Sequence, residues 1–264
     1  MISLTGDDLQ VQVLPEYGGK ITSLRVQGRE LLAQAPDASA YAPAPGSVFD
    51  KHAAWGWDDV FPAMGGGSDS DHGFLWTAPM RAKADQGGVT LTCEISGWHY
   101  VKRLTLQGRS LRAAWNITNQ APQIQSALWV CHCLWNAGPG IRFLFPQDYD
   151  PILADQESAD RTFECCPDVS MCAKQWGARP IQEGRCGFVL PDGKGKVLIR
   201  YDADKLPFLG FWISTGGWNH THQFAFEPST SFYDTRARAE KSGTLLWLQP
   251  GETAAFSMDL EFLS

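Results

Sequence analysis

The sequence contains no apolar run that approaches the roughly 20 residues a membrane-spanning helix needs. Basic residues are also few: 22 lysines and arginines stand against 29 aspartates and glutamates, which gives a net charge of −7. A negative chain without a clustered basic patch is repelled by phosphate backbones, so nucleic-acid binding is not expected. The first residues, MISLTGDD, lack the basic start and apolar core of a secretion signal. We therefore expect contact with neither membrane nor nucleic acid.

Cysteine is present in an odd number, seven, and the seven are scattered along the chain. They cannot all form disulfides within one chain, and unmatched cysteines are typical of reduced thiols in a cytoplasmic protein. Free cysteine packs as a small hydrophobe, so most of the seven are expected in the core. The composition predicts a cytoplasmic location rather than a secreted fold held by disulfides.

Long helices are also missing from the pattern. Glycine (26) and proline (16) recur at short intervals, and helical spacing is confined to residues 234–241 and 155–160. No linker divides the chain, so residues 1–264 are expected to form one all-β domain built from antiparallel sheets. Segments that alternate apolar and polar residues at period two predict strands at 9–14, 89–95, 111–118, 196–201 and 255–262.

The segment SALWVCHCLWN, residues 126–136, carries the first candidate for chemistry. If it forms one strand, alternation puts Cys131 and Cys133 on one face and His132 on the other. Zinc needs ligands that converge, so this geometry disfavours a metal site. On this segment alone, His132 is either a core histidine or, if a carboxylate faces it, a catalytic one.

A carboxylate candidate lies in THQFAFEPST, residues 221–230. In an extended chain the two phenylalanines point to one face, whereas Gln223 and Glu227 point to the other. A glutamate among small or polar neighbours indicates an opening in the sheet, the alternative being a glutamate at the solvent end of a strand. Pro228 has no N–H to donate and is expected to end the strand.

Two further segments, AWGWDDVFPA (54–63) and SDHGFLW (70–76), are dense in glycine, acids and tryptophan. Loops of this kind on a rigid scaffold commonly carry binding residues. Asp58 and Asp59 are adjacent and point apart on an extended chain, so at most one of them faces a site.

Taken together, these segments resemble the aldose 1-epimerase, or galactose mutarotase-like, family. Each motif is short, but their order and spacing extend over more than two hundred residues. The motifs are LPEYGGKITSL (14–24), GRELL (28–32), GWDDVFP (56–62), DHG (71–73), the His132 strand, PFLGFW (207–212), FEPST (226–230) and LQPGET (248–253).

The resemblance implies a large antiparallel β-sandwich, the galactose mutarotase-like supersandwich, with an open sugar-binding cleft and neither cofactor nor metal. In such enzymes a glutamate takes the proton from the anomeric hydroxyl, and a histidine protonates the ring oxygen. By position, Glu227 matches this base, His132 matches the acid, and His72 matches a histidine that contacts the sugar. The protein is thus expected to be an isomerase that acts on a small-molecule sugar, as a monomer or homodimer.

The residue types suit these roles. Glutamate is ionised at neutral pH, histidine can carry a proton there, and each such group typically contributes about 10²–10⁴-fold. The 11 tryptophans exceed what a core requires, and aromatic rings stack on the apolar faces of sugars. Trp57 and Trp212 are the candidate sugar platforms, and Asp59 is the candidate for the family's additional sugar-binding aspartate.

The chain departs from the galactose-specific branch, in which an Asn-Arg pair precedes the first histidine. Here the run WDD at 57–59 occupies that region, so the resemblance is to a divergent branch and the sugar need not be galactose. Related members act on hexose 6-phosphates, which requires a basic group at the cleft rim. Arg25, Arg81 and Lys20 are the candidates for it.

Two other hypotheses stay open at this point. A carbohydrate-binding protein of the same fold without catalysis would not need Glu227 and both histidines. A zinc or redox protein built on Cys131, His132 and Cys133 is testable by metal analysis of the purified protein.

Overall fold

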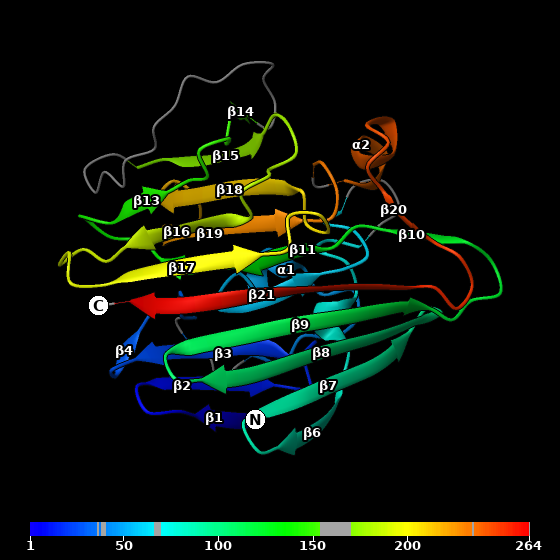
Figure 1. The fold of residues 1–264 in the computed structure, drawn as a ribbon, viewed down its shortest axis with the longest axis horizontal. Helices are drawn as coiled ribbons and strands as arrows, with labels where there is room; N and C mark the ends of the chain where they lie inside the picture. Colours follow the sequence, from blue (N-terminus) through cyan, green and yellow to red (C-terminus); the bar gives the residue numbers. More distant parts are fainter. Residues whose placement is uncertain (36, 38–40, 66–69, 154–169, 234, 264) are drawn as a thin grey trace.

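Two antiparallel β-sheets packed against each other form the body of the molecule (Figure 1). The computed structural model describes residues 1–35, 37, 41–65, 70–153, 170–233 and 235–263. Within these residues one sheet has eleven strands, the other has eight, and a separate ribbon has two. The described chain is an all-β sandwich with two short α-helices, in agreement with the predicted fold class.

The eleven-stranded sheet contains the N-terminal strands and all the strands that form the candidate site. Its order is β1 (Ile2–Thr5), β2 (Leu9–Leu14), β3 (Lys20–Val26), β5 (Trp57–Val60), β11 (Val130–Cys133), β19 (His222–Ser229), β18 (Phe208–Thr215), β15 (Cys172–Gly177) and β14 (Pro151–Leu153). Off this path, β4 (Arg29–Glu30) pairs with β3, and β12 (Trp135–Asn136) pairs with β19. Because β5, β11 and β19 are neighbours, segments far apart in the sequence meet in the middle of this sheet.

The remaining elements form the second sheet, the ribbon and three short helices. The eight-stranded sheet runs β13 (Arg142–Leu144), β16 (Arg185–Val189), β17 (Lys196–Tyr201), β21 (Thr253–Leu263), β9 (Ser110–Asn119), β8 (Trp98–Gln107), β7 (Gly88–Ile95) and β6 (Arg81–Asp85). The ribbon pairs β10 (Gln125–Ala127) with β20 (Leu246–Leu248). The helices are α1 (Phe49–His52), the 3₁₀ turn η2 (Leu75–Thr77) and α2 (Arg236–Lys241).

Alternating burial explains why the period-two segments fold as strands. In β2 and β9, buried residues alternate with exposed or half-buried ones along the strand, so each strand has one face on the core. The predicted strands at 9–14 and 196–201 have the observed bounds, and β7, β9 and β21 extend the other three by one to three residues. The predicted helical segment 234–241 contains α2, whereas residues 155–160 lie outside the described residues.

Residues 126–136 do not form one strand, because the chain changes partners along this segment. It pairs first with β20 as β10, then with β5 as β11, and finally with β19 as β12. The alternation survives these changes: Cys131 and Cys133 lie in the core between the sheets, and His132 faces the other way. Pro228 does not end its strand either; it pairs with Leu209 inside β19, since the fixed φ of proline suits an extended chain.

The core between the sheets encloses a charged group, Asp59 on β5. Its carboxylate accepts hydrogen bonds from Lys102 Nζ at 3.0 Å, from Tyr100 Oη at 2.9 Å and from Trp115 Nε1 at 2.8 Å. The side chains of Asp59 and Lys102 are fully buried. A buried charge is tolerated when it is paired and hydrogen-bonded, and this network ties β5 of one sheet to β8 and β9 of the other.

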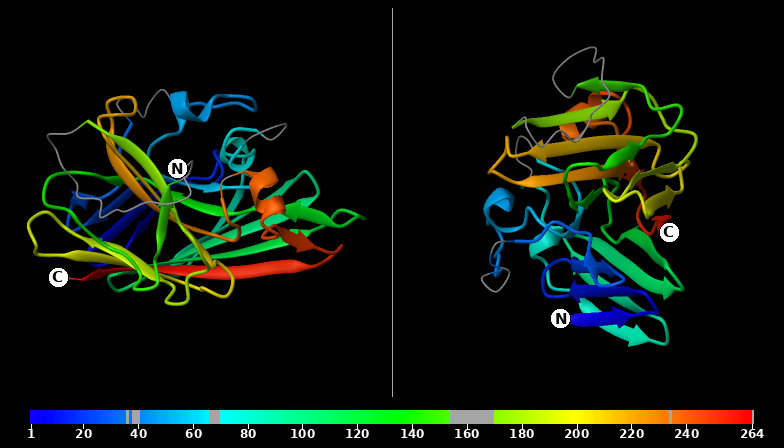
Figure 2. Two further views of the ribbon diagram at one scale, coloured as in Figure 1. Left: turned by 90° about the horizontal axis from the view of Figure 1, so that it is seen from above. Right: turned by 90° about the vertical axis from the view of Figure 1, so that its left-hand side faces the viewer.

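The opposite face of the eleven-stranded sheet looks away from the eight-stranded sheet, and Figure 2 (left) shows α1 on that side. Loops between β4 and β7 and after β18 and β19 also border it. No helix in the described part of the chain is long and apolar enough to cross a membrane.

Candidate active site

A pocket of about 370 Å³ lies on the face of the eleven-stranded sheet that is turned away from the core. This volume is within the range of about 300–1,000 Å³ that is usual for small-molecule sites. Strands β11, β15, β18 and β19, both α-helices and adjoining loops contribute to it. The lining residues are Phe49, Asp50, Ala54, Met64, His72, His132, Leu134, Lys174, Trp212, Trp218, Gln223, Glu227 and Arg238.

Glu227 and His132 meet in this pocket because of strand register. On the two sides of this point, β19 pairs Ser229 with Val130 and Phe224 with Trp135. The same register puts His132 level with Glu227 on the adjacent strand, and both side chains face away from the core. Glu227 is 1% exposed and His132 is 8% exposed, so both side chains lie deep in the sheet face.

An aromatic cluster holds the two histidines of the pocket together. The ring of His72 stacks on Phe49 with a centroid separation of 3.7 Å, and the centroids of His72 and His132 are 4.9 Å apart. Asp71 Oδ1 lies 2.7 Å from Nδ1 of His72, and this bond holds the pKa of Asp71 below its usual range. An ionised carboxylate can only accept, so Nδ1 of His72 is the donor and its tautomer is fixed.

Burial keeps His132 uncharged. It lowers the pKa of His132 well below its ordinary value of 6.5, and the nearby His72, Lys174 and Lys20 lower it further. A core histidine normally has its ring nitrogens satisfied, but Nδ1 of His132 is buried without a hydrogen-bond partner among the described residues. This unsatisfied ring, turned into a pocket, favours a functional histidine over a structural one.

Lys174 on β15 is a pocket residue that the sequence analysis missed. Its Nζ donates to Oε2 of Glu227 and forms a salt bridge with it. Lys174 pairs with Trp212 across β15 and β18, and Trp212 pairs with Ala225 of β19, so all three share one row of the sheet face. A neighbouring ammonium favours the ionised carboxylate, which is the form a general base needs.

Two glycines leave the space that these side chains occupy. Gly210 pairs directly with Glu227, and a Cβ at this position would lie 2.8 Å from Oε2 of Glu227 and 3.3 Å from Trp176. Gly73 follows His72 with φ of +75°, and a Cβ there would lie 2.0 Å from the carbonyl oxygen of Phe61. In the motifs PFLGFW and DHG, glycine thus avoids a clash that any side chain would cause next to Glu227 and His72.

The structure brings four of the six predicted site residues together and leaves two outside. Glu227, His132, His72 and Trp212 line the pocket. Trp57 and Asp59 do not, because they occupy the positions of β5 that face the core, where both are fully or almost fully buried. Their roles as sugar platform and sugar-binding acid therefore need correction, since a sugar in this pocket cannot reach through the sheet to touch them.

The basic groups of the pocket are also different from those predicted. Lys20 is buried and bonds Asp58 together with the carbonyl oxygens of Ala53 and Trp55. Burial lowers the pKa of Lys20 and raises that of Asp58, and each charge opposes the effect on its partner. Neither Lys20 nor Arg25 nor Arg81 lines the pocket.

Lys174 and Arg238 line the pocket instead. No motif in the sequence marks either residue. The register of β15 places Lys174 in the pocket, and the position of α2 over the sheet places Arg238 there.

Within the described part of the chain, no group of three or more histidine, cysteine or acidic side chains could hold a metal ion. Cys131 and Cys133 pack in the core on the side of β11 opposite His132. This arrangement separates the three residues on which a zinc or redox site would depend.

Comparison with known proteins finds solved structures of the same fold. Residues 175–262 match a family described as a domain of unknown function (DUF4432), and no curated protein matches the sequence. The Slr1438 protein of Synechocystis is structurally similar, with a TM-score of 0.79, 19% identity, and coverage of 99% of this chain and 95% of that one.

Two other structures carry names that refer to mutarotase. A galactose mutarotase related enzyme of Lactobacillus acidophilus has a TM-score of 0.75 at 13% identity, covering 100% of this chain and 97% of the other. A galactose mutarotase-like protein of Clostridium acetobutylicum has a TM-score of 0.70 at 14% identity, covering 98% and 94%. At such identities the similarity establishes the fold, which is galactose mutarotase-like.

Proposed function

We propose that the protein is an aldose 1-epimerase, or mutarotase, that interconverts the α and β anomers of an aldose. The observation that carries this proposal is the pairing of Glu227 and His132, level on adjacent strands and open to one pocket. Opening a cyclic hemiacetal needs a base at the anomeric hydroxyl and a proton donor at the ring oxygen. The fold shared with mutarotase-related proteins supports the same class of reaction.

In this proposal Glu227 takes the proton of the anomeric hydroxyl while the bond between C1 and the ring oxygen breaks. His132 keeps its proton and donates an N–H hydrogen bond to the ring oxygen, which carries the negative charge of the opened ring while C1 becomes an aldehyde. Rotation about the bond from C1 to C2 presents the other face of the aldehyde, the ring oxygen attacks that face, and Glu227 returns its proton to the new anomeric hydroxyl. Each residue ends in its starting state, and no cofactor enters the cycle.

The electrostatics of the pocket suit these steps. Because His132 is neutral, it acts as a neutral hydrogen-bond donor to the charge that develops on the ring oxygen, a type of stabilisation that is strong in a buried site. Lys174 favours the ionised form of Glu227 before the reaction. Trp212 and His72 line the pocket with the two proposed reacting groups, and Trp212, next to Trp218, offers an aromatic surface for stacking on the sugar.

The proposal is tested by proton NMR of anomer exchange with glucose, galactose and their 6-phosphates. We expect the protein to accelerate exchange of at least one of these above the buffer rate. Binding of a sugar without any acceleration would favour a carbohydrate-binding protein of the same fold, and the mutarotase assignment would then be wrong.

A hexose 6-phosphate is a second candidate for the substrate, because two cationic side chains line the pocket. Lys174 and Arg238 both reach it, and arginine is well suited to phosphate through its planar set of donors. If the substrate is phosphorylated, Arg238→Met should lower kcat/KM for the 6-phosphate and leave that for the free hexose unchanged. Equal losses for both sugars would assign Arg238 to the architecture of α2.

A cytoplasmic location and a monomeric or dimeric state belong to the same proposal. The five described cysteines are free thiols, which suits a reducing compartment. Sedimentation of the purified protein would decide the oligomeric state.

A further inference from the structure

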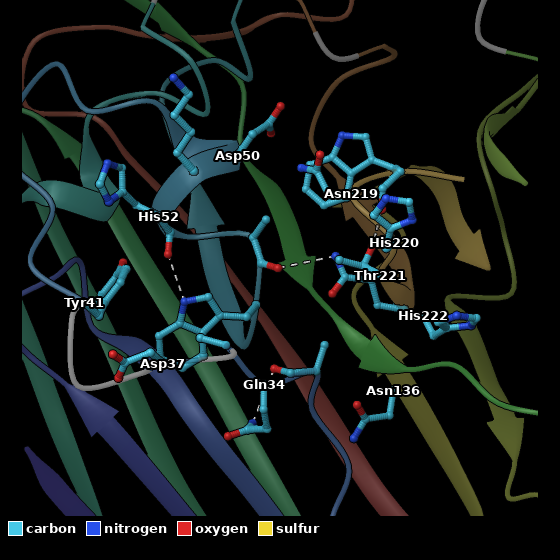
Figure 3. Close-up of a pocket in the computed structure, with 17 residues that line it drawn as sticks. Gln34, Asp37, Tyr41, Asp50, His52, Asn136, Asn219, His220, Thr221 and His222 are labelled. Atoms are coloured by element: carbon cyan, nitrogen blue, oxygen red, sulfur yellow. Dashed lines mark hydrogen bonds between the residues drawn. The ribbon is translucent and has the colours of Figure 1, made fainter. Parts of the chain in front are cut away.

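A second and larger cavity, of about 700 Å³, adjoins the candidate active site (Figure 3). Asp50, Ala54, Trp218 and Gln223 line both spaces, so the second cavity continues the first along the sheet face. Figure 3 shows the opposed walls of this cavity, with labelled side chains that include Tyr41, His52, Asn136, Asn219 and His220. A single hexose bound at Glu227 would leave this space unfilled.

The lining of the second cavity combines the two kinds of group that recognise uncharged sugars. Trp55, Trp218 and Tyr41 supply aromatic surface, and Asn136 and Asn219 supply planar amides that both donate and accept hydrogen bonds. Asp50 and Lys51 give the wall charges of both signs, so no field of one sign calls for a charged ligand. Apolar surface with a few polar groups is the usual composition of a small-molecule site.

Tyr41 supplies a second, independent sign of a ligand. Its side chain is 8% exposed, and its hydroxyl is buried without a hydrogen-bond partner among the described residues. A buried hydroxyl without a partner is costly and rare in native structures. Tyr41 lines the cavity, and its covered hydroxyl would gain a partner if a ligand displaced the atoms above it.

The geometry of β19 sets the reach that a ligand needs. Gln223 and Glu227 lie on the same face of this strand, four residues apart. At about 3.3 Å per residue, their Cα atoms are on the order of 13 Å apart. Gln223 lines both spaces, so a ligand that extends past it from a ring at Glu227 enters the second cavity.

We infer that the second cavity is a subsite for a further sugar unit, so that the substrate is a reducing disaccharide or longer oligosaccharide. This inference rests on the proposed function, and it specifies the class of aldose. Anomer exchange requires a free anomeric hydroxyl on the ring at Glu227. The second unit must therefore be attached to a different carbon of that ring, and it extends past Gln223 towards Tyr41 and Asn136.

The test compares glucose with disaccharides that have glucose at the reducing end: maltose, cellobiose and isomaltose. We expect kcat/KM for anomer exchange of at least one disaccharide to exceed that of glucose by about tenfold or more, mainly through a lower KM. A tenfold gain in affinity needs only a few good contacts with the second sugar unit. Asn136→Trp should fill the second cavity and abolish this advantage. Tyr41→Phe, which removes one hydroxyl, should reduce it in part.

Neither Asn136 nor Tyr41 lines the first pocket, so exchange of glucose should be unchanged in both variants. Disaccharides that react no better than glucose would overturn the inference while the mutarotase function stands. Saturation-transfer NMR gives a readout that does not need catalysis. Binding of a disaccharide that Asn136→Trp abolishes, without any exchange, would support the subsite and overturn the proposed function. Neither exchange nor binding with any disaccharide, together with no exchange of glucose, galactose or their 6-phosphates, would overturn both.

Discussion

Among single residues, His132 matters most for the proposed reaction through its charge state. Burial and nearby cations lower its pKa well below 6.5, so it is neutral throughout the neutral pH range. If the neutral imidazole is the active form, the rate of anomer exchange should stay level as pH falls to 6.5 and should not rise below it. Protonation of His132 at more acidic pH removes that form and lowers the rate. A pH–rate profile corrected for the buffer rate measures this.

The opposite profile would contradict the assignment. If the imidazolium were the acid, the rate would rise as pH falls below 6.5, because a larger fraction of His132 would carry the proton. His132→Gln, which keeps an N–H donor without a titrating group, should retain part of the activity and lose the contribution of His132 to the profile.

A substitution at Gly210 tests how precisely the carboxylate of Glu227 must be positioned. A methyl group at Gly210 would lie 2.8 Å from Oε2 of Glu227, so Gly210→Ala should displace the carboxylate and disturb its bond to Lys174. We expect kcat to fall by about 10²-fold, since a displacement near 1 Å can cost that much, with little change in melting temperature. Gly138→Ala is the matched control, because its Cβ meets nothing within 4 Å. Full activity in Gly210→Ala would mean that Glu227 tolerates displacement and is not a closely positioned base.

At the scale of elements, β5 shows why one face of a strand cannot be assigned from adjacent acids alone. Asp58 and Asp59 point apart, as the extended chain predicts, but both turn out to be buried, each with its own lysine. The sequence does not show that Asp58 pairs with Lys20 of β3 and Asp59 with Lys102 of β8. Asp59 lies on the face of β5 that contacts the second sheet, so its side chain does not line the pocket.

Asp59→Asn should therefore destabilise the protein rather than weaken sugar binding. It leaves Lys102 buried without its counter-ion, and breaking a buried pair costs about 3–5 kcal/mol of the free energy of unfolding. Asp259→Asn on the exposed pair with Arg112 is the control, with an expected loss of about 1 kcal/mol or less. Urea unfolding measures both. A variant of Asp59 that is fully stable but no longer binds sugar would return this residue to the site.

The strands themselves could be predicted because their signal is local. Alternation at period two marks 9–14 and 196–201 with the observed bounds, and it assigns His132 and its flanking cysteines to opposite faces. The breaks in 126–136 could not be predicted, since they follow from a change of partner strand that only the assembled sheet determines.

At the scale of the whole molecule, the site is a product of sheet order. The motifs that resemble aldose 1-epimerases indicated Glu227, His132, His72 and Trp212, and these four line one pocket. Lys174 and the second cavity had no sequence signal, because the register of β15 places Lys174, and the cavity forms where α1 and the loop after β18 lie over the sheet. The fold and the meeting of these four residues in one pocket were thus predictable from the sequence, and the side chains around them were not.

The role of Glu227 as the general base is tested most directly by the rate of anomer exchange in wild type and in Glu227→Gln, measured with the preferred sugar at saturation. Glu94→Gln, an exposed glutamate on the eight-stranded sheet, controls for the loss of one charge. We expect the exchange rate of Glu227→Gln to fall by at least about 10²-fold while the variant remains folded and still binds the sugar. Glu94→Gln should exchange at the wild-type rate. Wild-type exchange in a folded Glu227→Gln variant would contradict the account, because the reaction would then proceed without its proposed base.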